Sequence, residues 1–231
     1  MTAAPRIPAL VTSLDGDTSS TGPGDGSDAR ARTARPTSAV VERNVAVPMR
    51  DGTVLRADVY RPDGPGRYPV LLQRLPYGKG DSGFVVVASA LEPLRAAEAG
   101  FVVVVQDVRG RGASDGVFQP FEQETADGAD TVAWAAAQPF SDGRVAMYGV
   151  SYAGATQLLA AVDGPPALAA VAPHFTGAEY YDGWTYQGGA FQLGFARLWA
   201  DGLAGRRRPV TGIADPDDDI WRAYRHLPLL D

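Results

Sequence analysis

Continuous apolar runs rich in β-branched residues restrict the fold of this chain more than any other feature of its sequence. They cover Tyr68 to Leu72 and Phe101 to Val105. A strand with one face in water alternates apolar and polar residues, whereas a strand covered on both faces carries an unbroken apolar run. We therefore predict two central strands of a sheet that is covered on both sides.

Segments with apolar residues at helical spacing separate these strands from further ones. Helices are predicted over residues 82–99, 122–138 and 152–162, and further strands over 145–150 and 168–172. Gly100 follows the first of these helices and suits a left-handed helix cap. Because strands alternate with helices, the sequence predicts the α/β class with a mainly parallel sheet.

An antiparallel hairpin is predicted at the start of the sheet. Apolar residues alternate over 41–47 and 54–60, and the two stretches flank Asp51-Gly52. An Asp-Gly pair supplies the positive φ angles of a tight hairpin turn. With this hairpin, the sequence predicts six strands before residue 174.

Local composition divides the chain into three parts. Residues 12–37 contain almost no large apolar side chain, so we predict a disordered leader over 1–38. The α/β core is predicted over 39–173. After His174 the sequence becomes rich in Gly and aromatic residues, with a further helix that ends at Leu203. We interpret 174–231 as the start of a helical cap and expect the sheet to be incomplete at its C-terminal end.

The overall composition excludes several functional classes. A net charge of -6 provides no basic surface for nucleic acid or an anionic membrane. With 0 Cys and 2 His, the chain has neither a disulfide framework nor a cysteine-ligated metal site, and we predict no metal, nucleotide or organic cofactor. It shows no signal-peptide pattern and no apolar run of about 20 residues, the length of a membrane-spanning helix, so we predict a cytoplasmic protein.

Ser151 is the candidate nucleophile, because it lies where the predicted strand 145–150 gives way to a helix. The nucleophile elbow of an α/β-hydrolase holds its serine in a strained turn that requires small neighbours. Gly149, Ala153 and Gly154 meet this requirement, although the common motif has Gly two residues after the serine. The alternative is an ordinary strand-to-helix turn whose serine side chain caps the helix.

Attack on an acyl carbonyl also requires donors for the negative oxygen that develops. The backbone N–H of Tyr152 directly follows the serine and is one candidate. A second donor in this fold comes from the loop after the third strand, which reads Arg74-Leu-Pro-Tyr-Gly78 and contains the Tyr77 hydroxyl. From spacing alone, a half-buried loop tyrosine is the simpler interpretation of Tyr77.

Four segments together resemble the CocE/NonD and X-Pro dipeptidyl-peptidase group of serine hydrolases. They are Val47-Pro-Met-Arg-Asp-Gly-Thr-Val-Leu-Arg-Ala-Asp-Val-Tyr-Arg-Pro62, Arg74-Leu-Pro-Tyr77, Gln106-Asp-Val-Arg-Gly-Arg-Gly-Ala-Ser-Asp-Gly116 and Gly149-Val-Ser-Tyr-Ala-Gly154. The elbow of this family reads Gly-x-Ser-Tyr-x-Gly, so Ala153 agrees with it. The resemblance implies an α/β-hydrolase fold and cleavage of a small-molecule or peptide acyl substrate: a carboxylic ester, an amide or an X-Pro peptide.

The resemblance also implies roles for individual residues. Ser151 looks like the nucleophile, with Tyr77 and the Tyr152 amide as the oxyanion donors. Trp184 resembles the entrance to a cap over the acyl pocket, but a packing role fits this aromatic residue equally well. Residues 107–116 resemble the loop after the fourth strand, where we expect the Asp and Arg side chains to brace the turn.

The Asp and His of the family's triad follow the cap, so the resemblance implies that this chain does not contain them. His174 precedes any acid of the cap and His226 has no strand leading to it, so neither is assigned as the base. Glu179, Asp182 or the acidic run 217–219 could hold a peptide amine, although surface carboxylates are the simpler interpretation of them. We expect this chain alone to have little activity. The alternative function is a non-catalytic α/β scaffold or binding module.

Overall fold

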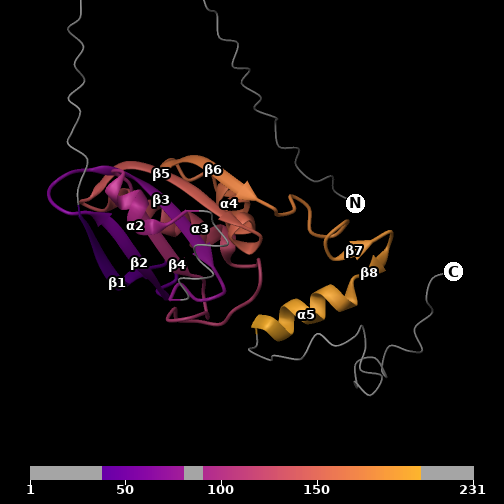
Figure 1. Cartoon of the computed structure of the whole chain (residues 1–231). Helices are drawn as coiled ribbons and strands as arrows, with labels where there is room; N and C mark the ends of the chain where they lie inside the picture. Colours follow the sequence, from indigo (N-terminus) through magenta and orange to yellow (C-terminus); the bar gives the residue numbers. More distant parts are fainter. Residues whose placement is uncertain (1–37, 81–90, 204–231) are drawn as a thin grey trace, which may run out of the picture. The chain divides into compact units, whose positions relative to one another are not determined.

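The computed structural model describes residues 38–80 and 91–203, which contain a six-stranded sheet in the order β1-β2-β4-β3-β5-β6 (Figure 1). The strands are β1 (Ala39–Pro48), β2 (Val54–Pro62), β3 (Tyr68–Leu75), β4 (Val102–Asp107), β5 (Ser141–Val150) and β6 (Leu168–His174). Strands β4, β3, β5 and β6 are parallel, whereas β1 pairs antiparallel with β2 and β2 with β4. The predicted α/β class, the six strands and the mainly parallel sheet are confirmed.

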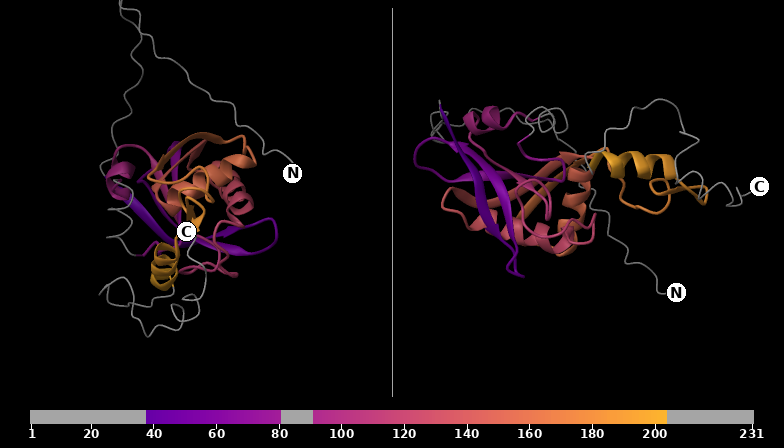
Figure 2. Two further views of the ribbon diagram at one scale, coloured as in Figure 1. Left: turned by 90° about the vertical axis from the view of Figure 1, so that its right-hand side faces the viewer. Right: turned by 90° about the horizontal axis from the view of Figure 1, so that it is seen from below.

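The N-terminal hairpin forms around Asp51-Gly52, as predicted, and β1 and β2 run side by side along their length (Figure 2). Gly52 has a φ of 86°, which a side chain would strain. The register shifts between Glu42 and Val45, where Asn44 has a φ of 54°. The Asn44 N–H at this bulge donates to Asp58 Oδ1 at 2.9 Å, so a buried carboxylate of β2 stabilises it.

Four helices lie in the described part of the chain: α2 (Pro93–Glu98), α3 (Glu124–Ala137), α4 (Tyr152–Val162) and α5 (Leu193–Leu203). Helix α2 forms the described part of the helix predicted over 82–99. It begins at Pro93, because the Glu92 carboxylate accepts from the N–H groups of Leu94 and Arg95 and caps the helix there. Residues 81–90 lie outside the described residues. None of these helices is long and apolar enough to cross a membrane.

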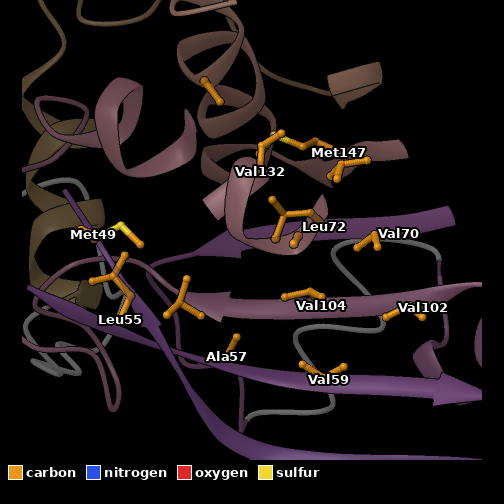
Figure 3. Packing of buried hydrophobic residues seen from close by; sticks show 14 residues of the cluster. Met49, Leu55, Ala57, Val59, Val70, Leu72, Val102, Val104, Val132 and Met147 are labelled. Carbon is orange, nitrogen blue, oxygen red and sulfur yellow. The ribbon is translucent and has the colours of Figure 1, made fainter. Parts of the chain in front are cut away.

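The buried residues of the sheet form two clusters, because alternate side chains of a strand point to opposite sides of the sheet. Val70, Leu72, Val102 and Val104 lie in one cluster with Val132 of α3 (Figure 3), and Ala160 of α4 belongs to the same cluster. Leu75, Val103 and Val105 lie in a second cluster with Ala96 of α2 and Ala153 of α4. Every residue of β4 is buried, which confirms the prediction for Val102 to Val105, whereas Phe101, the first residue of the predicted run, is exposed.

A short hairpin, which the sequence analysis did not predict, follows β6. Its strands are β7 (Tyr186–Gln187) and β8 (Ala190–Phe191), and they meet at Gly188-Gly189. Both glycines have positive φ angles, 57° and 85°, as a two-residue hairpin turn requires. Most of the predicted leader, and the cap residues 204–231, lie outside the described residues. The division into leader, core and cap therefore stays a prediction.

Candidate active site

Ser151 occupies the turn between β5 and α4 with φ 58° and ψ -121°, a conformation that a residue with a side chain adopts only under strain. Its backbone is fixed on both sides. The N–H donates to the His174 carbonyl at the end of β6 at 3.0 Å, and the carbonyl accepts from the N–H groups of Gly154 and Ala155 at 2.8 and 3.0 Å. The neighbouring strand and the first turn of the helix thus hold the serine in its strained geometry.

Small residues make room for this turn, as the sequence predicted. A Cβ added to Gly149, whose φ is 138°, would lie 2.6 Å from the Cβ of Ala153. A Cβ added to Gly154 would lie 2.7 Å from Thr176 Cγ2. Both distances are too short for carbon atoms in contact, so positions 149 and 154 require glycine for the helix to pack against the strand.

The Ser151 side chain is partly exposed and makes no capping hydrogen bond to α4. The alternative in which this hydroxyl caps the helix is therefore wrong. The Tyr152 N–H is the first of α4, where helical N–H groups have no intrahelical partner. No acceptor for it is found among residues 38–80 and 91–203. A hydroxyl and an N–H donor thus lie on adjacent residues at the start of a helix.

The side chain of Tyr152 is buried and anchored to α3. Its hydroxyl donates to Glu124 Oε1 at 2.8 Å and accepts from the Phe121 N–H at 3.0 Å. Burial and the charge of Glu124 raise the pKa of the Tyr152 phenol well above its usual range. The phenol therefore stays protonated and keeps this contact over the whole neutral range.

A layer of buried polar residues continues below Tyr152. Arg74 Nη1 donates to Glu124 Oε2 at 2.7 Å, and Arg74 Nε donates to Gln106 Oε1 at 2.7 Å. Thr131 Oγ1 also donates to Gln106 Oε1, at 3.1 Å. The side chains of Arg74 and Glu124 are 0% and 4% exposed, so this ion pair is shielded from water. Sequence reasoning missed it, because an acid in the first turn of a helix is typical of a solvated end.

Tyr77 lies in the loop after β3 and packs against the cluster that contains Leu75 and Ala153. Its hydroxyl oxygen accepts a long hydrogen bond of 3.4 Å from the Trp199 indole N–H. Trp199 also stacks on Tyr152, with ring centroids 6.1 Å apart. The tryptophan of α5 therefore links the side chains of the two residues predicted as oxyanion donors.

An aromatic cluster that the sequence analysis did not assemble surrounds Phe121. This ring stacks on Tyr152 and Tyr180 at centroid distances of 4.7 and 4.8 Å and on Trp199 at 5.9 Å. Phe121 has a φ of 69°, so its backbone is strained to bring the ring to this position. Trp184 meets Phe121 edge-on at 6.2 Å. The structure thus places Trp184 in the same cluster as Tyr152.

The candidate polar residues after β6 have structural contacts. The Glu179 carboxylate accepts from the N–H groups of Tyr181 and Asp182 at 2.7 and 2.9 Å, so it closes a local turn. His174 is exposed at the end of β6, and its carbonyl holds the Ser151 N–H. His226 lies outside the described residues. No described imidazole is hydrogen-bonded to the Ser151 hydroxyl.

The strand order, the parallel core and the strained serine turn after β5 define the α/β-hydrolase class. A family model covers most of the chain and gives a narrower assignment. The chain belongs to the X-Pro dipeptidyl-peptidase (S15) family, whose model matches residues 51–228. The family resemblance seen in the sequence motifs is confirmed.

Individual relatives agree with this assignment. The chain is 45% identical over 168 residues to cocaine esterase from Rhodococcus sp. strain MB1 Bresler, a match that covers 71% of this chain and 29% of the esterase. Among solved structures it is similar to a CocE/NonD family hydrolase from Staphylococcus aureus, with a TM-score of 0.68, 28% identity and coverage of 84% and 37%. It is also similar to an aminopeptidase from a marine sediment archaeon of the Thaumarchaeota, with a TM-score of 0.64, 25% identity and coverage of 87% and 36%. The chain spans about a third of the length of these relatives.

Proposed function

We propose that this chain is the nucleophile-bearing part of a serine hydrolase that cleaves acyl bonds in carboxylic esters, amides or X-Pro peptides. The backbone of Ser151 carries the proposal, with a φ of 58° in a turn between strand and helix. A strained serine whose hydroxyl does not cap the following helix costs stability, and such strain is typical of functional sites. The esterase and peptidase names of the relatives support the same reaction class.

The reaction would proceed by acyl transfer to the serine. Ser151 Oγ forms a bond to the acyl carbon while its proton passes to a base, and the carbonyl oxygen becomes negative. The tetrahedral intermediate collapses, the alcohol or amine leaves with a proton, and an acyl ester on Ser151 remains. Water then attacks this ester, which releases the carboxylic acid and restores the hydroxyl.

We assign Tyr77 and the Tyr152 amide as donors to the negative oxygen. The Tyr152 N–H stands at a helix N-terminus, where the aligned peptide dipoles favour negative charge. In its contact with Trp199 the Tyr77 oxygen is the acceptor, because an indole N–H can only donate. We propose that the phenolic O–H of Tyr77 donates to the oxyanion when substrate is bound.

A fluorophosphonate probe tests the nucleophile directly, because it forms a covalent bond with an activated serine. We expect peptide mass mapping of the treated chain to show one adduct, on Ser151. Added imidazole should accelerate the reaction by acting as a base in solution. Ser151→Ala should abolish the adduct, and the chain unfolded in urea should not react at that position.

The opposite result favours the scaffold alternative. A folded chain that gives no Ser151 adduct, with or without imidazole, contradicts the proposed nucleophile. Circular dichroism on the same sample establishes that the chain is folded. Labelling spread over several serines at equal rates would contradict it too, since a primed hydroxyl must react faster than an ordinary one.

Trp184 is proposed to contact the acyl group, because its ring belongs to the aromatic cluster that includes Tyr152, the neighbour of the nucleophile. Probes with an aryl and with a small alkyl group on phosphorus distinguish this role from packing. Trp184→Ala should slow the aryl probe more than the alkyl probe. Tyr181→Ala is the control, because this exposed ring stacks on Tyr186 instead. Equal slowing of both probes contradicts the proposed contact.

A further inference from the structure

The loop that carries Tyr77 is held at both ends by the last residue of β4 and by the loop that follows β4. Arg111 Nε donates to the carbonyl of Pro76 at 2.8 Å. Asp107 Oδ1 accepts from the backbone N–H of Lys79 at 2.7 Å. Between these two points lie only Tyr77 and Gly78, whose φ is 95°. The backbone of the tyrosine is therefore fixed on both sides by side chains from another strand and its loop.

The Asp107 carboxylate is buried and has donors for both oxygens. Its Oδ2 accepts from Lys79 Nζ at 3.0 Å and from the Ala113 N–H at 3.0 Å. A Cβ added to Gly112, whose φ is 54°, would lie 2.1 Å from Oδ2, so only glycine lets the loop close around the carboxylate. A buried carboxylate is costly unless it is paired and hydrogen-bonded, and each of these contacts offsets that cost.

Lys79 connects the same loop to the N-terminal hairpin. Its Nζ donates to Asn44 Oδ1 at 2.7 Å and lies 3.9 Å from Asp58 Oδ1. The side chain is 6% exposed, so the ammonium is surrounded by these partners and Asp107. Arg111 is held as well, since its guanidinium lies over the Phe118 ring at 5.4 Å. The two side chains that hold the Tyr77 loop, Asp107 and Arg111, are therefore themselves fixed by other residues.

We propose that Asp107 and Arg111 are positioning residues that set the place of the Tyr77 hydroxyl, an inference that rests on the proposed function. An oxyanion donor must lie about 2.7–3.1 Å from the oxygen that it stabilises. Displacement by about 1 Å can cost on the order of 100-fold in rate. The bracing role predicted for the loop 107–116 would therefore act on the reaction through the tyrosine.

A double-mutant cycle on the second-order rate constant of fluorophosphonate labelling at Ser151 tests this proposal, because the phosphoryl oxygen of the probe takes the place of the oxyanion. Tyr77→Phe should slow labelling by about 100-fold, the usual effect of one lost donor. Arg111→Met should slow it by about tenfold when Tyr77 is present, and by less than about twofold in the Tyr77→Phe background. Asp107→Asn should behave like Arg111→Met.

The matched control is Arg50→Met, which removes an arginine that pairs with Asp130 instead of the tyrosine loop. It should leave labelling unchanged in both backgrounds. If the effects of Arg111→Met and Tyr77→Phe multiply, Arg111 does not act through the tyrosine and the proposal is overturned. A wild-type chain that is not labelled, even with added imidazole, would overturn the proposed function instead.

Hydrogen exchange distinguishes a failure of the positioning proposal from a failure of the proposed function, because it does not depend on a reactive serine. In the full chain, Arg111→Met and Asp107→Asn should raise the exchange rate of the Lys79 amide, which donates to Asp107 Oδ1, by at least about tenfold. Arg50→Met should not change it. Unchanged protection of this amide in both the Arg111 and the Asp107 variant would overturn the positioning role, whatever the labelling experiment shows.

Discussion

The Tyr152 hydroxyl donates to Glu124 Oε1 at 2.8 Å, and this contact joins the first residue of α4 to the first residue of α3. The other oxygen of the carboxylate accepts from Arg74 at 2.7 Å. The residue after the candidate nucleophile is therefore fixed at both ends. Its backbone belongs to the strained turn, and its side chain ends on a buried ion pair. We therefore expect a substitution among these buried polar residues to disturb the turn that holds Ser151.

Removal of the Tyr152 hydroxyl should destabilise the fold. Tyr152→Phe deletes a donor to a buried carboxylate, so we expect the free energy of unfolding in urea to fall by about 1.5–3 kcal/mol. Tyr148→Phe is the matched control, because the buried Tyr148 hydroxyl has no hydrogen-bond partner among the described residues. Its loss should leave stability unchanged or increase it. An equal loss in both variants would contradict the importance of the Glu124 contact.

Stability should decrease in alkaline solution. The pKa of the Tyr152 phenol is raised above its unfolded value of about 10, first by burial and then by Glu124. The folded state binds this proton more tightly, so the stabilisation is complete below pH 10 and is lost as the pH rises toward the folded value. Burial raises the pKa of Tyr148 in the same direction.

Urea unfolding between about pH 9 and about pH 11 measures this effect. We expect the wild-type free energy of unfolding to decline over the upper half of that range. Tyr152→Phe and Tyr148→Phe should each make the decline shallower, because each removes one group with a raised pKa. The same slope in all three proteins would show that neither phenol is responsible.

The fold and the position of Ser151 could be predicted because both depend on local patterns. Unbroken apolar runs identified the buried strands, and β4 is buried throughout. Small residues beside Ser151 identified the elbow, because a helix can pack this closely against a strand only where the side chains are small. In each case the residues that decide the structure lie within a few positions of one another.

The surroundings of the site could not be predicted, because tertiary packing assembles them. Phe121 has a positive φ, which its residue type does not predict. Its ring also stacks on Trp199, which belongs to a helix far along the chain. Glu124 reads as a solvated acid at a helix start and is in fact buried. The Gly188-Gly189 hairpin was missed because each of its strands has only two residues.

The elbow glycines should tolerate no side chain. Gly149→Ala adds a methyl group 2.6 Å from Ala153 at a positive φ, and Gly154→Ala adds one 2.7 Å from Thr176 Cγ2. We expect each to reduce the free energy of unfolding by about 1–3 kcal/mol. Gly194→Ala is the control, because an added Cβ meets no atom within 4 Å on α5. It should leave stability unchanged or raise it by up to about 1 kcal/mol.

A second substitution can show that the clash itself is responsible. Thr176→Gly removes both Cγ2 and Cβ, the two atoms that lie 2.7 and 2.9 Å from a Cβ at position 154. The double variant Gly154→Ala/Thr176→Gly should therefore be more stable than the sum of the two single effects predicts. Strict additivity would mean that Gly154 is needed for another reason, such as the backbone conformation of the helix start.

The buried ion pair should be costly to break and much less costly to replace. Arg74→Met leaves the Glu124 carboxylate in a site that is 4% exposed, with the Tyr152 hydroxyl and no cation beside it. We expect a loss of about 3–5 kcal/mol in urea unfolding, because a buried charge without its partner keeps its full desolvation cost. Arg74→Met/Glu124→Leu removes both charges and should recover much of that loss, although Tyr152 then lacks its acceptor. A double variant as unstable as the sum of the two single variants would mean that the residues act independently, and that the elbow does not rest on their pairing.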